Sequence, residues 1–272
     1  MRSTFIGGGN MACAIIGGLV ARGAPPSDIR VVEPQAAQRE RIAGRFPKVR
    51  VFADLAGGEA VAGAAIVVLA VKPQQMRDAA RQLSPHVGGV PLVLTIAAGV
   101  RCDDLAAWLG GYRTIVRAMP NTPALIGAGI SGLYATPEAR PGASPAVDVL
   151  EACGEVIWCD DERKLDAVTG VSGSGPAYVF YFLEALERAA VDLGIDARDA
   201  RKLAYATFAG SVALAQQSAE PPATLRANVT SRDGTTARAL ATLDAARVAD
   251  HFVAAVKAAA DRARELGDEI AR

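Results

Sequence analysis

The chain begins with a glycine-rich turn set between an apolar strand and an apolar helix, and no other feature narrows its fold as much. Residues 1–12 contain Gly7-x-Gly9-x-x-Ala12, and the helix-patterned segment Met11–Val20 follows. Gly7 permits a tight turn, Gly9 lets the backbone approach a pyrophosphate, and Ala12 lets the helix pack closely on its strand. The N-terminus of the helix adds free N–H groups and partial positive charge. The pattern predicts a dinucleotide-binding turn.

Composition and length favour an enzyme without a nucleic-acid or membrane partner. At 272 residues the chain can bury a substantial core in one large or two medium domains. Lys+Arg and Asp+Glu both number 29, so no electrostatic footprint for nucleic acid or an anionic membrane is present. The longest apolar stretches, Ala64–Val71 and Pro91–Ala98, are too short to span a bilayer. No charged-then-apolar leader precedes the first strand, so we expect a cytoplasmic protein.

The four cysteines and two histidines do not form a metal-binding pattern. There is no CxxC pair, and no histidine accompanies a cysteine at ligand spacing, so we expect no zinc site. Reduced thiols are the expected state in the cytoplasm.

The first part of the chain alternates short apolar runs with helix-patterned segments, which predicts a parallel sheet covered on both faces. The expected strands after the first are Ile29–Val32, Val49–Phe52, Ala65–Ala70, Leu92–Ile96, Thr114–Ala118, Ile130–Tyr134 and Glu155–Trp158, with helices at Gln35–Phe46, Gln74–Leu83 and Ala143–Cys153. The pair Gly17-Gly18 in the first helix requires a partner that packs close to it.

After Asp160-Asp161 the pattern becomes helical almost to the end. A helix is expected to start at Ser174-Gly175-Pro176, with Ser174 as its N-cap. The fold class is therefore α/β, with an N-terminal Rossmann-type doubly wound sheet in residues 1–161 followed by an all-α domain in residues 162–272.

Five segments follow predicted strand ends, where ligands of an open α/β sheet bind. They are Gly7–Met11, Glu33-Pro34, Val71–Gln74, Ile96–Gly99 and Met119–Pro123. Prolines and glycines end strands in any protein, and Lys72 is equally well read as a solvated loop charge. Five such segments in register with the glycine-rich turn nevertheless favour a nucleotide site.

Glu33 lies 21 residues beyond Ala12, where an acidic side chain accepts hydrogen bonds from the adenosine ribose. A carboxylate there favours NADH and repels the 2′-phosphate of NADPH. Arg39 compensates only if it turns back toward the site. The alternative is that Glu33 is a helix-capping charge before Pro34.

In the helical part, the segment Asn228–Thr236 interrupts the helices with hydroxyls, a glycine and a single apolar side chain, Val229. Hydroxyl donors and backbone N–H groups at a helix N-terminus can bind a small carboxylate. An ordinary cap at Thr235 or Thr236 explains the same residues equally well.

The chain resembles the pyrroline-5-carboxylate reductase family in motifs that keep their order and spacing over nearly its whole length. The matching stretches are Ile6–Ala12, Ala70–Gln74, Arg117–Ala124 (RAMPNTPA), Val168–Tyr178 (containing SGSGPAY), Asn228–Ser231 and Gly234–Thr236. The combination of RAMPNTPA, SGSGPAY and a late GTT loop is highly specific to that family.

The resemblance implies a Rossmann domain and a helical dimerisation domain, in a homodimer that in such enzymes often assembles further, with the substrate site near the dimer interface. It implies NADPH- or NADH-dependent reduction of 1-pyrroline-5-carboxylate to L-proline, the last step of proline biosynthesis. The cofactor residues would be Ile6, Gly7, Gly8, Gly9, Asn10, Met11, Glu33, Ala70, Val71, Lys72, Pro73, Ile96, Ala97 and Ala98. The substrate residues would be Asn228, Ser231, Gly234, Thr235 and Thr236, with Thr236 hydrogen-bonded to the ring nitrogen as the catalytic residue.

Two departures from the family pattern stand out. The family's Ser-Pro-Gly-Gly loop reads Ser231-Arg232-Asp233-Gly234 here, which puts the backbone shape in question and adds a negative charge near an anionic substrate. Arg232 either offsets that charge or contacts the carboxylate. Gly57 replaces an asparagine that the family often has near the adenosine.

Three other functions share features of this sequence. A β-hydroxyacid dehydrogenase shares the plan of the fold but needs a lysine early in the second domain, and Val168–Tyr178 has none. A reductase of a related cyclic imine, such as a six-membered one, would have nearly the same sequence. A non-catalytic redox sensor that binds NAD(P)H is favoured only by the altered Arg232-Asp233 loop.

Overall fold

The computed structural model describes residues 1–271 and contains an eight-stranded sheet in the order β3-β2-β1-β4-β5-β6-β7-β8. The strands are β1 (Ser3–Ile6), β2 (Ile29–Val32), β3 (Arg50–Phe52), β4 (Ile66–Leu69), β5 (Val93–Thr95), β6 (Ile115–Met119), β7 (Gly129–Ala135) and β8 (Gly154–Trp158). The chain adds strands on one side of β1 up to β3 and then returns to the other side with β4. The strand order therefore reverses between β1 and β4, and such a switch point is where an open sheet forms its ligand crevice.

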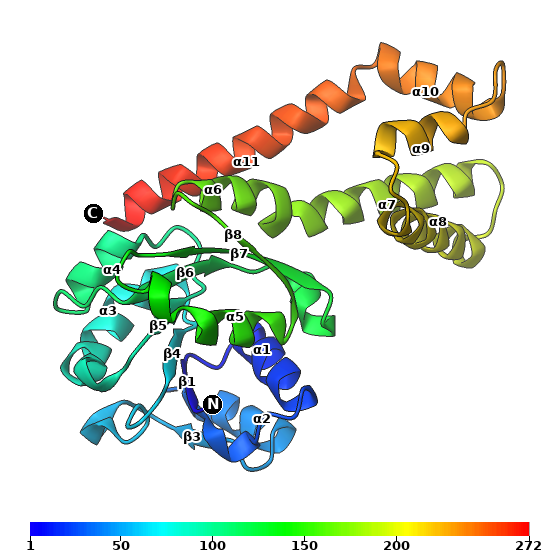
Figure 1. The fold of residues 1–272 in the computed structure, drawn as a ribbon. Coiled ribbons are helices and arrows are strands. Elements are labelled where there is room, and N and C mark those ends of the chain that lie inside the picture. The colour runs from blue at the N-terminus through cyan, green and yellow to red at the C-terminus, as the bar shows by residue number, and fades with distance from the viewer. Residues whose placement is uncertain (272) are drawn as a thin grey trace. The chain divides into compact units, whose positions relative to one another are not determined.

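Five helices alternate with the strands (Figure 1): α1 (Asn10–Ala21), α2 (Ala36–Arg45), α3 (Pro73–Leu83), α4 (Cys102–Trp108) and α5 (Ser144–Glu151). The remaining helices are α6 (Lys164–Val168), α7 (Gly175–Asp192), α8 (Ala197–Gln217), α9 (Pro222–Asn228), α10 (Thr235–Ala245) and α11 (Val248–Ala271). None of the helices within residues 1–271 is both long enough and apolar enough to cross a bilayer.

The chain forms two compact units. Unit 1 contains residues 1–174 and the C-terminal part of α11 from Ala258 onward, and unit 2 contains Gly175–Lys257. The units divide the chain at other positions than residue 161, because α6 contacts β6 and β7 and the end of α11 packs beside Gly99. In unit 2, Phe252 of α11 packs edge-on against Tyr178 and Phe182 of α7, with ring centroids 5.6 and 5.7 Å apart.

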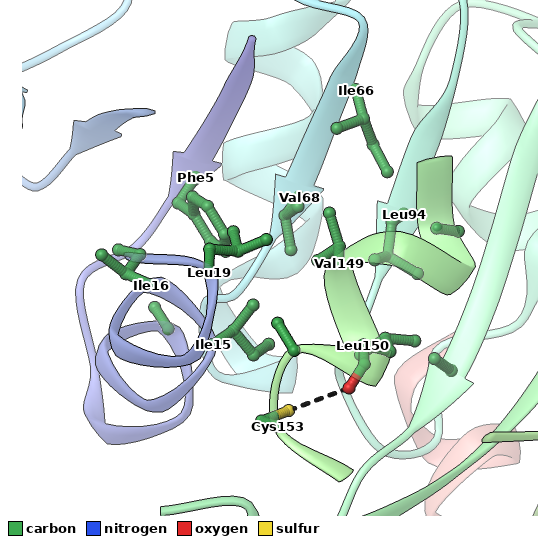
Figure 2. Close-up of a cluster of buried hydrophobic side chains, with 14 of the residues drawn as sticks. Phe5, Ile15, Ile16, Leu19, Ile66, Val68, Leu94, Val149, Leu150 and Cys153 are labelled. Carbon is green, nitrogen blue, oxygen red and sulfur yellow. Dashed lines mark hydrogen bonds between the residues drawn. The ribbon is translucent and has the colours of Figure 1, made fainter. Parts of the chain in front are cut away.

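The central strands of the sheet are buried on both faces. In β4, Ile66 and Val68 join one apolar cluster while Val67 and Leu69 join the other, and all four side chains are inaccessible to solvent. Figure 2 shows the first cluster, in which α1 and α5 cover Phe5 of β1 and the neighbouring strands. This two-sided burial explains why these strands are apolar without interruption.

The glycine pair in α1 lies at a close helix contact, as its sequence predicts. A Cβ atom on Gly18 would overlap the backbone carbonyl of Ala152, directly after α5. A Cβ atom on Gly17 would lie 3.7 Å from Phe46, which is an ordinary contact. Only Gly18 is therefore required by packing.

The sheet is not parallel throughout, which corrects one prediction. β6 and β7 pair antiparallel, whereas β7 and β8 are parallel. The connection from Met119 to Gly129 contains only a short 3₁₀ turn, Thr122–Ile126, and a parallel crossover needs a dozen or more residues.

Ser174 does not act as the predicted N-cap, although α7 begins at Gly175 as expected. Ser174 has helical backbone angles and donates its N–H to the carbonyl of Thr169, whereas an N-cap residue is extended. A π-helical turn, Thr169–Gly173, leads directly into α7 and replaces the cap.

Candidate active site

The glycine-rich turn leaves β1 through Gly7, whose φ of 97° favours glycine. Gly7 N–H donates to the carbonyl of Val32 at 2.8 Å, and a Cβ atom here would lie 2.8 Å from the carbonyl oxygen of Ala70. Gly9 is exposed, and no atom lies within 4 Å of where its Cβ would be. Gly9 is the N-cap of α1, which has no side-chain cap. The first N–H groups of α1 therefore remain available to an anion such as a pyrophosphate.

Glu33 holds the glycine-rich turn in place. Its Oε2 accepts the N–H of Gly8 at 3.0 Å, and its Oε1 accepts the N–H of Gln35 at 2.9 Å. The side chain is 8% exposed. Glu33 therefore accepts a hydrogen bond at the start of α2, where Gln35 is the N-cap, in agreement with the capping interpretation. A carboxylate has further lone pairs, so its contact with a ribose stays a prediction.

Arg39 turns back toward the loop that follows β2. Its Nη1 donates to the carbonyls of Glu33 at 3.0 Å and Pro34 at 2.7 Å. Arg39 therefore lies next to the backbone of Glu33, and its effect on the choice of cofactor stays a prediction. Gly57 has a φ of 68°, with open space where its Cβ would lie. Because asparagine also tolerates this conformation, the glycine is not forced by the backbone.

All fourteen cofactor candidates lie at one edge of the sheet. Ile6 is the last residue of β1, and the other candidates follow the carboxyl ends of β2, β1, β4 and β5, which are consecutive strands in the sheet. Lys72 is exposed and is the N-cap of α3. Ile96 and Ala98 are half-buried, whereas Ala97 is buried. The grouping fits a dinucleotide that crosses the switch point between β1 and β4.

The substrate candidates lie in unit 2, around the start of α10. Gly234 N–H donates to the carbonyl of Ser231 at 3.2 Å, closing a four-residue turn in which Asp233 has a φ of 60°. Positive φ at the third residue is the pattern of a type II turn, which favours Pro-Gly at its centre. The family's Pro-Gly pair therefore suits this turn, and aspartate is among the residues that tolerate the left-handed conformation. The turn accommodates Arg232-Asp233.

The helix that follows this turn offers free donors. Gly234 is the N-cap of α10 and supplies no side chain, so neither Thr235 nor Thr236 is the cap residue. A Cβ atom on Gly234 would overlap the hydroxyl of Ser231. The first N–H groups of α10 and the hydroxyls of Thr235 and Thr236 share the end of the helix that attracts anions.

Among the other residues of the segment, Asn228, Val229, Arg232 and Asp233 are exposed. Arg232 and Asp233 form an ion pair at 3.8 Å in which both side chains are more than nine-tenths exposed. Asn228 closes α9, and its amide donates to Glu220 at 2.9 Å. Because exposed pairs contribute little, the Arg232–Asp233 pair does not fix the turn.

Arg117, Glu162 and Asp166 form an ionic cluster that the sequence did not predict. Glu162 accepts the N–H of Cys102 at 2.8 Å and Nη1 of Arg117 at 2.9 Å, and Asp166 lies 3.6 Å from Arg117. Burial raises the pKa of Asp166, and burial likewise raises the pKa of the Cys102 thiol. The only feature of the sequence that pointed to Arg117 was its place in the RAMPNTPA motif, and no feature pointed to Glu162.

The cluster borders a cavity of about 550 Å³, and a second, more apolar cavity of about 590 Å³ lies beside β7 and β8. The first is lined by Arg101, Arg117, Glu162, Arg163, Asp166, Ala167, Ala260, Asp261 and Arg264. Neither cavity is lined by a predicted cofactor or substrate residue. Within residues 1–271, no three His, Cys, Asp or Glu side chains gather as a metal-binding set.

Two family models match the chain. Residues 162–266 match the model for pyrroline-5-carboxylate reductase dimerisation, and residues 2–99 match the model for NADP oxidoreductases dependent on coenzyme F420. The two matches fall on the helical segment and on the glycine-rich part of the sheet.

Relatives and solved structures match almost end to end. A pyrroline-5-carboxylate reductase from Pseudomonas aeruginosa is 43% identical over 99% of this chain and 98% of its own, and one from Haemophilus influenzae is 40% identical over 96% of each. A solved pyrroline-5-carboxylate reductase from Coxiella burnetii is 36% identical, with a TM-score of 0.90 over 97% of this chain and 98% of its own. The enzyme from Plasmodium falciparum, solved with NADP bound, is 26% identical, with a TM-score of 0.86 over 98% of each chain. On this evidence the chain belongs to the pyrroline-5-carboxylate reductase family.

Proposed function

We propose that the protein is a 1-pyrroline-5-carboxylate reductase that reduces the cyclic imine with NADPH or NADH to give L-proline in the last step of proline biosynthesis. The match to family members over nearly the whole chain carries this proposal. The open glycine-rich turn supports it, because Gly9 leaves room for a pyrophosphate above the start of α1. The P. falciparum enzyme with NADP bound supports the same class of cofactor.

This reaction depends on the positioning of cofactor and substrate more than on acid–base catalysis. When bound, the reduced nicotinamide supplies a hydride, and the protonated imine already carries the positive charge that accepts it at carbon. In this proposal the turns at the ends of β1, β4 and β5 hold the cofactor, and the N-terminus of α10 binds the substrate carboxylate. Thr236 hydrogen-bonds to the ring nitrogen, with Asn228, Ser231, Gly234 and Thr235 shaping the pocket.

We also propose a homodimer formed through unit 2, with dimers assembling further. Unit 2 exposes large apolar side chains, which mark interaction surfaces when they are contiguous. Examples are Phe180, Tyr181, Leu193, Tyr205, Val212 and Leu214, each between 54% and 82% exposed. The family model for dimerisation matches the same part of the chain. The four free, buried cysteines support a location in the reducing cytoplasm.

Oxidation of NADPH and of NADH, each followed by absorbance with 1-pyrroline-5-carboxylate, tests the function. We expect turnover with at least one cofactor and slower turnover of the six-membered cyclic imine. Faster turnover of the six-membered ring would favour the related imine reductase. Cofactor binding without turnover of either imine would favour the redox sensor.

Substitutions of Glu33 and Arg39 test whether the charges that follow β2 determine the preference between NADPH and NADH. Glu33→Gln removes a negative charge and is expected to raise the ratio of kcat/KM for NADPH to that for NADH, whereas Arg39→Gln is expected to lower it. Each shift should be about three- to ten-fold, the range of a single partly screened charge. Steady-state assays of both variants with both cofactors measure the ratio. Shifts in the same direction in both variants would contradict the electrostatic explanation.

Substitutions of Asp233 test whether the turn before α10 shapes the substrate site. Asp233→Gly and Asp233→Asn keep a residue that tolerates positive φ, and we expect the KM for the imine to stay the same or fall as the negative charge is lost. Asp233→Val puts a β-branched residue at the same angle and should raise that KM about ten-fold, a cost in the usual range for backbone strain. Equal KM values for the valine and asparagine variants would show that the turn does not shape the site.

A further inference from the structure

The last two turns of α11 contact both segments that follow β4 and β5. Arg101 donates Nη2 to Oδ1 of Asp268 at 2.6 Å. Arg77 of α3 donates Nη2 to the carbonyl of Ile270 at 3.2 Å. Both pairs join unit 1 residues more than 160 positions apart in the sequence, so the end of α11 bridges helix α3, which follows β4, and the loop that follows β5.

The backbones of α11 and of the loop after β5 also meet closely. Gly99 has a φ of 77°, and a Cβ atom built on Gly267 would lie 3.1 Å from the carbonyl oxygen of Gly99. A Cβ on Gly99 would in turn lie 3.1 Å from Cδ1 of Ile270. Two glycines therefore face each other, and a side chain on Gly267 has to displace a backbone carbonyl.

The same end of the loop is also held by Glu162. Glu162 accepts the N–H of Cys102, the first residue of α4. Val100 between these contacts is fully buried. The end of this loop, from Gly99 to Cys102, is thus contacted both by Glu162 and by Gly267 and Asp268.

We propose that the C-terminal end of α11 positions the loops after β4 and β5 and thereby sets the affinity for the nicotinamide cofactor, with Gly267 and Asp268 as positioning residues. The inference rests on the proposed function, because it takes Ala70–Pro73 and Ile96–Ala98 as cofactor contacts. Gly99 directly follows Ala98, and Arg77 lies one turn beyond Pro73, so a shift of α11 moves both contact segments together. Neither positioning residue is among the proposed cofactor contacts.

The test compares variants of the full-length protein by the Kd for NADPH and for NADH, measured from the nicotinamide fluorescence. Gly267→Val is expected to raise the Kd about ten-fold, as overpacking against a backbone carbonyl displaces the loop. Asp268→Asn should raise it about three-fold, as expected for a half-exposed ion pair. At saturating cofactor, kcat and the KM for the imine should change less than two-fold in Asp268→Asn, because only the cofactor loops move.

Two matched variants separate positioning from general helix stability. Arg262→Gln removes ion pairs with Glu265 and Glu269 within the same helix and should leave the Kd unchanged. Exchanging the charges, with Arg101→Asp and Asp268→Arg together, should bring the Kd closer to that of the parent than Asp268→Arg alone. If Gly267→Val does not fold, the Asp268 variants and the exchange decide the matter.

The outcomes separate the two proposals. An unchanged Kd in Asp268→Asn, or an equal rise in Arg262→Gln, would overturn the positioning role while a catalytically active parent upholds the reductase. A folded parent that binds neither nucleotide would overturn both.

Discussion

Replacing Thr236 with alanine is expected to lower kcat/KM for 1-pyrroline-5-carboxylate roughly ten- to hundred-fold, the usual loss for a hydrogen bond to a charged group. The Kd for NAD(P)H should not change, because Thr236 is not among the residues proposed to hold the cofactor. Within residues 1–271 its hydroxyl makes no hydrogen bond, and Gly234 is the N-cap of α10. The substitution therefore removes a free hydroxyl without removing a helix cap.

Thr236→Ser is the control for this prediction, because it retains the hydroxyl and loses only a methyl group. We expect the serine variant to stay within a few-fold of the parent, since the retained hydroxyl preserves the hydrogen bond. Steady-state kinetics at saturating cofactor give kcat and KM separately. An alanine variant with the parent's kcat/KM would show that the ring nitrogen is not bound by Thr236.

The largest stability effect is expected for Gly18→Ala. The new Cβ would overlap the carbonyl oxygen of Ala152, a backbone atom that cannot turn away as a side chain can. Helix α1 would have to move off the chain after α5, and overpacking of this kind costs about 3 kcal/mol of unfolding free energy or more. Because α1 starts at the glycine-rich turn, the shift should also weaken cofactor binding.

Gly17→Ala, one residue earlier, is the matched control. Its Cβ would lie 3.7 Å from Phe46, and alanine is the better helix former by about 1 kcal/mol, so the variant should match or exceed the parent in stability. Urea denaturation at one protein concentration measures both, because the stability of an oligomer depends on concentration. Equal stabilities for the two variants would mean that α1 and Ala152 are not in close contact.

The sequence predicts the sheet well where local pattern decides the structure. The central strands have almost uninterrupted apolar sequences because both of their faces are buried. Gly7 is recognisable in the sequence because its turn admits no side chain. The direction of β7 was missed because hydrophobic patterning is the same in parallel and antiparallel strands; the short connection after Met119 was the available signal.

The site is predicted less completely, for a physical reason. Glu162, Asp268 and Gly267 act through contacts with residues far away in the sequence, and no local pattern encodes such contacts. From the sequence, Arg232-Asp233 put the backbone shape of the loop in question, because the sequence does not show the type of turn. A φ of 60° at Asp233 shows that this residue adopts a conformation glycine prefers and aspartate tolerates.

The split composition of unit 1 has a consequence for how the chain folds during synthesis. The part of α11 that completes this unit, from Ala258 onward, leaves the ribosome only after all of unit 2. Domains generally fold as they emerge, but here the loop around Gly99 has to wait for its partner helix. Nascent unit 1 therefore carries an uncovered surface until the segment around Ile270 has left the ribosome, and the order of synthesis delays the final packing of the nucleotide-binding edge.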